Sequence, residues 1–64
     1  MNRTQFEKHL RAHGCWRYVH GGRHDIWLSP TAAIPVAVPR HKEIKLGTAR
    51  AICKQLGIPA PSGR

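Results

Sequence analysis

The side chains in this sequence that are best suited to chemistry are histidines rather than acids. The 64 residues include five histidines but only three acidic residues, Glu7, Asp25 and Glu43. A catalytic pair of divalent cations needs several carboxylates close together, and Glu7 is expected to serve as a helix cap. The composition therefore disfavours metal-dependent hydrolysis. It favours proton transfer by imidazole, whose ordinary pKa of about 6.5 suits both acid and base catalysis near neutral pH.

Two of the five histidines stand out by their neighbours. His24 follows Arg23 and lies two residues after Gly22, and His41 follows Arg40, which is itself preceded by a proline. An arginine beside an imidazole can stabilise negative charge that develops on a substrate. The residues by themselves leave His24 and His41 both open as candidates, because a single histidine in a strand is more often structural than catalytic.

The other histidines have simpler interpretations. His9 and His13 lie four residues apart on an expected helix, and with the nearby Cys15 they could imitate a zinc site. That set has only three ligands, and its cysteine follows a glycine that should end the helix, so both are interpreted as partly exposed helix residues. His20 is interpreted as a strand residue beside a turn. Cys15 and Cys53 lack zinc-like spacing and are expected to be small buried residues.

The charge balance indicates the kind of partner. Eleven Lys and Arg residues face three acids, which gives a formal net charge of +8. Such an excess favours polyanions, and nucleic acid is favoured over a membrane because the chain has no run of about 18 apolar residues. RNA carries its own nucleophile, the 2′-hydroxyl, so a protein that acts on it needs only to move protons and stabilise charge.

We therefore expect the chain to act on RNA without a metal or another cofactor. The alternatives are a non-catalytic basic RNA-binding module and a partner-binding protein with no RNA function. Residues 1–10 lack the apolar core of a signal peptide, and the cysteines form no disulfide-like or metal-like pattern, so a reducing cytoplasm is the expected location.

Two helices are expected to flank the region that carries the histidines. Thr4 and Glu7 match a capping box, which predicts a helix over about residues 4–13. A second helix is predicted near the C-terminus, where Thr48 would cap it and Gly57 would end it.

Three strands are expected between the helices. The β-forming residues on both sides of Gly21-Gly22, within residues 15–29, predict a hairpin. Alternating apolar residues over 34–38 predict a third strand, and its prolines place it at the edge of the sheet. The predicted order of elements is α-β-β-β-α.

The helices should cover one face of this sheet. Strand alternation places His24 on the same face as Ile26 and Leu28, which is expected to be the covered one. If the Gly-Gly loop is a simple two-residue turn, the open face carries Trp16, Tyr18, His20, Arg23 and Trp27. A one-residue bulge would reverse part of this assignment.

Two motifs that follow one another in the sequence resemble a known family. The first is the Gly-x-His of Gly22-Arg23-His24, in which His24 lies ten residues after Gly14. The second is Val38-Pro39-Arg40-His41 with the basic residues that follow it. Together with the predicted helix near the C-terminus, they are similar to the HicA-type mRNA interferase toxins of type II toxin–antitoxin systems. The resemblance extends over about residues 3–58.

The resemblance implies an α+β fold like that of the double-stranded-RNA-binding domain, with a three-stranded antiparallel sheet and both helices on one face. It also implies metal-independent endoribonuclease activity on mRNA and neutralisation by a cognate HicB-type antitoxin, which is a separate protein. By position, His24 would be the catalytic histidine and Gly22 the backbone element that lets it approach RNA. The neighbouring residues expected to bind the substrate are Arg23, Arg40, His41 and Lys42.

Two positions depart from the pattern of that family. Arg23 stands where Ser is common, which adds a phosphate-binding group beside His24. Val19 stands where Arg is frequent, and Arg17 or Arg23 could replace that arginine.

A single domain is expected over residues 1–58, followed by a mobile tail over 59–64. The tail and the edge strand near residues 34–38 are expected contact points for the antitoxin, because an edge strand offers unpaired backbone groups.

Overall fold

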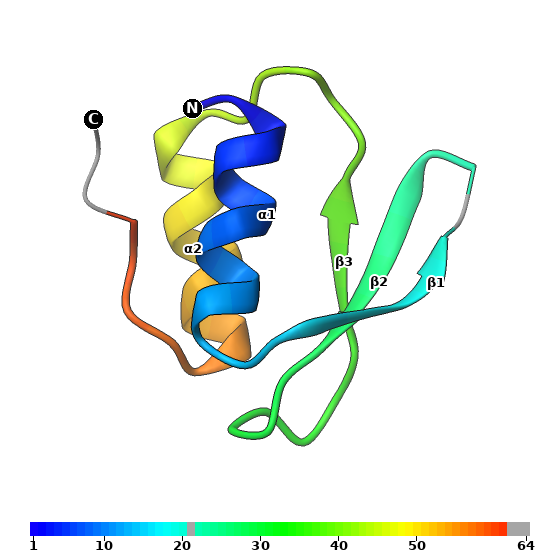
Figure 1. The fold of residues 1–64 in the computed structure, drawn as a ribbon, viewed down its shortest axis with the longest axis vertical. Coiled ribbons are helices and arrows are strands. Elements are labelled where there is room, and N and C mark those ends of the chain that lie inside the picture. Colours follow the sequence, from blue (N-terminus) through cyan, green and yellow to red (C-terminus); the bar gives the residue numbers. More distant parts are fainter. Residues whose placement is uncertain (21, 62–64) are drawn as a thin grey trace.

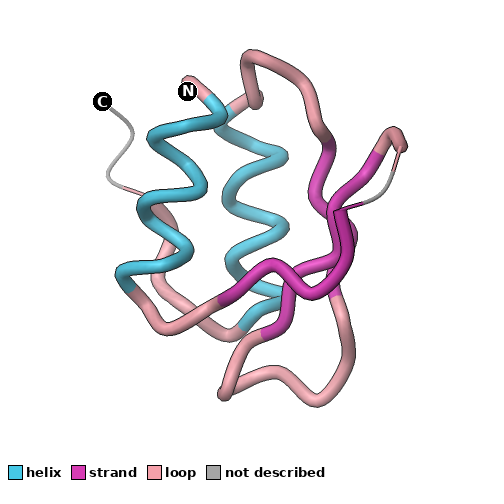
Figure 2. Tube along the Cα trace, turned by 45° about the vertical axis from the view of Figure 1, so that its right-hand side comes forward, coloured by secondary structure: helices cyan, strands magenta, loops and turns pink. Residues whose placement is uncertain are grey.

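The computed structural model describes residues 1–20 and 22–61, except for the side chain of His20. Gly21, which forms half of the expected Gly-Gly turn, and residues 62–64 of the expected tail lie outside the described residues. The elements are α1 (Arg3–Ala12), β1 (Trp16–His20), β2 (His24–Leu28), β3 (Val36–Pro39) and α2 (Leu46–Leu56). The strands form one antiparallel sheet in the order β1-β2-β3, and the two helices lie side by side against one of its faces (Figures 1 and 2). This is the α+β, double-stranded-RNA-binding-domain-like arrangement that was expected.

None of the helices in the described part of the chain is long and apolar enough to cross a membrane.

The start of α1 differs from the prediction. Asn2, not Thr4, is the N-cap, and its Oδ1 accepts a hydrogen bond from the Thr4 N–H at 2.7 Å. Glu7 is not part of a capping box, because its carboxylate lies 3.7 Å from Arg3 and 3.8 Å from Arg11 instead. The helix begins earlier than predicted because the Arg3 N–H is satisfied by the Lys42 carbonyl at 3.0 Å, a tertiary contact.

The second helix begins at Leu46, so the predicted Thr48 cap is also wrong, but its end is confirmed. Gly57 adopts a left-handed conformation with φ of 73°, and a Cβ at this position would lie 2.9 Å from Oγ1 of Thr31. The hydroxyls of Ser29 and Thr31 donate to the Leu56 carbonyl at 2.8 and 2.7 Å. These bonds satisfy the end of α2 and attach it to the segment that follows β2.

In β2 the two faces are the reverse of the expectation. His24 is exposed on the open face, whereas Trp27 is completely buried beneath the helices and Asp25 is 2% exposed beside it. The partner of Trp27 in β3 is Val36, which is also buried. The predicted alternation was correct, but the indole of Trp27 buries more apolar surface than Ile26 does, so the tryptophan face is the one that turns inward.

A β-bulge also changes the alternation of side chains within β1. Arg17 pairs with Trp27 and Val19 pairs with Ile26, so the residue between them has no opposite partner. Arg17 lies opposite Trp27 on the covered side of the sheet, and Tyr18 is exposed as expected. The bulge places Val19 opposite Ile26 on the open face, where it is 44% exposed. The third strand is shorter than predicted, because Ile34 lies before β3 and is 70% exposed.

The core lies between the sheet and the helices. Its buried apolar residues are Phe6, Leu10, Cys15, Trp27, Val36, Val38, Ile44, Ala49, Ile52, Cys53 and Leu56. Both cysteines are free and buried, as predicted. Burial raises the pKa of the Cys53 thiol, with a further contribution from the nearby Cys15, so this thiol stays neutral and acts as an apolar core group.

Candidate functional site

A hollow of about 470 Å³ opens where the β1–β2 hairpin meets the end of β3. It is lined by Gly22, Arg23, His24, Arg40 and His41. The hollow brings together five of the six residues that the sequence analysis assigned to a site. Two segments that are separated by some fifteen residues of chain thus contribute to one surface.

Backbone contacts hold the two segments together. His24 pairs with Pro39 at the end of the sheet, and the Arg40 N–H donates to the Arg23 carbonyl at 3.2 Å. The Arg40 guanidinium also donates through Nη1 to the Gly22 carbonyl at 3.1 Å. Arg40 therefore helps to fix the loop that carries Gly22 and Arg23 and leads into His24, in addition to lining the hollow.

Asp25 supports this arrangement from the covered side of the sheet. Its carboxylate is 3% exposed and lies 3.6 Å from Nη1 of Arg17 and 3.6 Å from Nε of Arg40. A buried carboxylate between two guanidinium groups holds both in place by charge and geometry. Sequence reasoning gave Asp25 no role. The signal that was available is its alternation with Trp27, since residues two apart in a strand share a face.

The chemical groups in the hollow suit a phosphodiester. His24 and His41 are exposed imidazoles that can accept or donate a proton, and neither lies in the core. Arg23 is exposed beside them, and Arg40 is half-buried with its side chain 30% exposed. Guanidinium groups match the oxygens of phosphate and stabilise negative charge on them.

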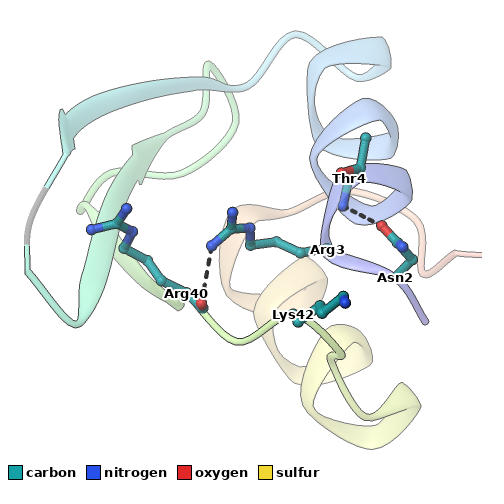
Figure 3. Close-up of a pocket in the computed structure, with 5 residues that line it drawn as sticks. All are labelled: Asn2, Arg3, Thr4, Arg40 and Lys42. Atoms are coloured by element: carbon teal, nitrogen blue, oxygen red, sulfur yellow. Dashed lines mark hydrogen bonds between the residues drawn. The ribbon is translucent and has the colours of Figure 1, made fainter.

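Lys42, the sixth predicted residue, does not line this hollow. It lies instead beside α1, in a second hollow of about 410 Å³ that is lined by Asn2, Arg3, Thr4, Arg40 and Lys42 (Figure 3). Arg40 is common to both hollows, so they adjoin one another. Arg3, which the sequence analysis did not consider, is a member of this second group.

The remaining histidines lie elsewhere. Nε2 of His9 donates to the Pro59 carbonyl at 2.8 Å, and the ring of His9 contacts that of His13 with centroids 4.7 Å apart. Cys15 is buried, whereas His13 is exposed. Within residues 1–20 and 22–61, no three His, Cys, Asp or Glu side chains gather as a set of metal ligands.

The role of Asp25 leads to a prediction about stability. Asp25→Asn keeps the shape of the side chain but leaves Arg17 and Arg40 without their buried counter-charge. We expect the free energy of unfolding to fall by about 1–3 kcal/mol, less than for a fully buried pair because both arginines are about one-third exposed. Urea unfolding followed by circular dichroism measures it.

Glu43→Gln is the matched control for this substitution. The carboxylate of Glu43 is 73% exposed and pairs with the N-terminal ammonium group at 3.3 Å, so its loss should change stability by less than about 0.5 kcal/mol. Equal effects of the two substitutions would show that the Asp25 cluster does not hold the hairpin.

Comparison with known protein families identifies a match. A family model described as the HicA toxin of bacterial toxin–antitoxin systems matches residues 3–58. No curated protein and no solved structure shows significant similarity to the chain. The matched region spans all five elements and includes both hollows except for Asn2. The chain belongs to the HicA toxin family of bacterial toxin–antitoxin systems.

Proposed function

We propose that this toxin is a metal-independent endoribonuclease that cleaves mRNA and that His24 is its catalytic residue. The observation that carries the proposal is the exposed His24 imidazole in one hollow with Arg23, Arg40 and His41. A net charge of +8 on 64 residues supports a polyanionic substrate. Arg23, His24 and His41 are all exposed along this hollow, which supports a polymer rather than a small molecule as the substrate.

The proposed reaction uses the ribose 2′-hydroxyl of the substrate as the nucleophile. His24 takes the proton from this hydroxyl as the oxygen attacks the adjacent phosphorus. The bond between phosphorus and the 5′-oxygen then breaks, and the leaving oxygen receives a proton from His41 or from water. Arg23 and Arg40 stabilise the additional negative charge on the phosphoryl oxygens. The products are a 2′,3′-cyclic phosphate and a 5′-hydroxyl.

Gly22 and Arg40 have positioning roles in this scheme. The Gly22 carbonyl accepts a hydrogen bond from Arg40, and a Cβ at Gly22 would meet no atom within 4 Å. Gly22 lines the same hollow as His24, and its lack of a side chain is expected to let the RNA backbone come close to His24. The guanidinium of Arg40 is held by Gly22 and Asp25, so its orientation is fixed before the substrate binds.

The nature of the products tests the proposed function. We expect the protein to cleave an RNA oligonucleotide with EDTA present and to leave a 2′,3′-cyclic phosphate. Replacement of a single ribose by 2′-deoxyribose at the cleaved step should abolish cleavage there, because the nucleophile is then missing. Mass spectrometry of the fragments identifies the ends. A 3′-hydroxyl product, or cleavage at the 2′-deoxy step, would contradict the mechanism; RNA binding without cleavage would favour the non-catalytic RNA-binding module instead.

The family implies that an antitoxin is the protein's partner. We propose that this antitoxin is of the HicB type and that it acts in the cytoplasm, where mRNA is available. The edge strand β3 is a suitable contact point for the antitoxin, because within residues 1–20 and 22–61 one of its sides has no neighbouring strand. Close to it, Ile34 exposes 70% of its surface, which offers an apolar contact for a protein partner.

A further inference from the structure

The second hollow adjoins the His24 hollow through a shared residue. Arg40 lines both of them, and Arg3 and Lys42 line only the second. In Figure 3 the cationic ends of Arg40, Arg3 and Lys42 lie in a row from the hairpin to the start of α1. The row is formed by α1 and by the segment between β3 and α2, which are far apart in the sequence.

Backbone pairing fixes the two segments that carry these cations. The Arg3 N–H donates to the Lys42 carbonyl at 3.0 Å, and Met1 and Ile44 exchange two hydrogen bonds, at 2.7 and 3.0 Å. Ile44 is buried in the core, so this pairing is anchored to the body of the domain. Arg3 and Lys42 are therefore held beside one another by main-chain geometry.

The Arg3 side chain is oriented before any ligand binds. Its Nη1 donates to the Arg40 carbonyl at 2.9 Å, and its Nε lies 3.7 Å from the Glu7 carboxylate (Figure 3 shows the first contact). Even so, 38% of the side chain is exposed, and Lys42 is exposed beside it. A guanidinium that is held at one edge and open at another needs little further ordering to bind an oxyanion.

We propose that a second phosphate-binding subsite is the hollow formed by Asn2, Arg3, Thr4, Arg40 and Lys42. It holds a phosphate of the RNA strand that does not react, while the neighbouring part of the same strand occupies the His24 hollow. The inference rests on the proposed function and adds a direction for the strand, from the hairpin across Arg40 to the start of α1. The two cationic hollows adjoin one another and share Arg40. An RNA backbone fits this arrangement better than a single free anion does, because it carries successive phosphates that can occupy both hollows. Substrates long enough to reach the second hollow should therefore be preferred.

The test compares substrates of two lengths. A dinucleoside monophosphate carries only the reacting phosphate, whereas an RNA of about ten nucleotides can fill both hollows. Arg3→Gln and Lys42→Gln are each expected to lower kcat/KM for the longer RNA roughly fivefold and to leave that for the dinucleoside monophosphate within about twofold. Lys54→Gln removes the same charge from an exposed position in the last turn of α2. It should leave kcat/KM unchanged for both substrates.

The salt dependence of binding supplies a second readout, which a purely structural role of Arg3 would not alter. It is measured in the His24→Ala background with the longer RNA, so that cleavage is too slow to disturb the binding measurement. Each lost phosphate contact should reduce the slope of log affinity against log salt by about 0.7, a change of about 2.6-fold between 50 and 200 mM. Urea unfolding of both variants shows whether the fold is intact.

The possible outcomes separate this inference from the proposed function. If the wild-type protein cleaves RNA but neither variant alters the length preference or the salt slope, the second subsite is wrong and the ribonuclease proposal stands. Equal losses on both substrates would also overturn the subsite, because they would mean that Arg3 and Lys42 act at the reacting phosphate. If the wild-type protein binds RNA without cleaving it and the variants still lower the salt slope, the subsite stands and the catalytic proposal fails.

Discussion

Replacement of His24 by alanine is expected to lower the rate constant for RNA cleavage by about 10²–10⁴-fold, because the substitution removes the group that moves the proton. Stability should change little, since the side chain is exposed and His24 is held in the sheet by backbone pairing with Pro39. The measurement is single-turnover cleavage of a defined RNA, with the free energy of unfolding of the variant measured alongside.

His41→Ala is the informative comparison, because its imidazole lines the same hollow. If His41 protonates the leaving oxygen, this variant loses activity as well, and the two single variants affect opposite limbs of the pH–rate profile. A His13→Ala variant removes an exposed imidazole from the far end of α1 and should cleave at the wild-type rate. Cleavage by His24→Ala at the wild-type rate would show that the catalytic assignment is wrong.

Replacement of Trp27 by alanine is expected to unfold the domain at room temperature. The loss of a completely buried tryptophan costs about 3–5 kcal/mol, and a domain of this size has roughly 3–5 kcal/mol in total. Trp27 is 0% exposed, and the guanidinium of Arg11 lies 5.4 Å from the centroid of its ring. Circular dichroism and urea unfolding measure the effect.

Two further variants show whether this result comes from packing. Trp27→Phe should keep the fold with a loss of about 1–2 kcal/mol, because the ring still fills most of the space. Within the described residues the Trp27 indole N–H has no hydrogen-bond partner, so phenylalanine removes no hydrogen bond. Trp16→Ala removes a tryptophan that is 49% exposed and should cost much less. A Trp27→Ala protein that unfolds at the same urea concentration as the wild type would contradict the assigned core.

Much of the fold was predictable because it depends on local chemistry. Buried residues at helical spacing, such as Phe6 and Leu10, predicted α1, and a glycine placed the end of α2 at Gly57. The element order and the antiparallel sheet followed from β-forming runs separated by turn residues. The caps of both helices were predicted at the wrong residues. The N-caps are Asn2 and Lys45, because both helices begin where residues 1–3 pair with residues 42–44 through backbone hydrogen bonds.

The candidate site was partly predictable for a similar reason. Gly22, Arg23 and His24 are neighbours in the sequence, and the resemblance pointed to Arg40 and His41 as well. No local pattern showed that these two short segments line one hollow, since that depends on the pairing of β2 with β3. The sequence also indicated nothing about Arg3, which reaches the site through its contacts with Lys42 and Arg40.

The sequence by itself determined the charge, the order of elements, the alternation within β2 and the presence of histidine beside arginine, because these depend on composition and on spacing along the chain. Only the tertiary structure decided which face of the sheet is covered, since that depends on whether Trp27 or Ile26 buries more surface against the helices. It also decided that Asp25 lies buried between Arg17 and Arg40. His24 is exposed for the same reason: once Trp27 and Asp25 turn inward, the pleat of the strand directs His24 to the open face.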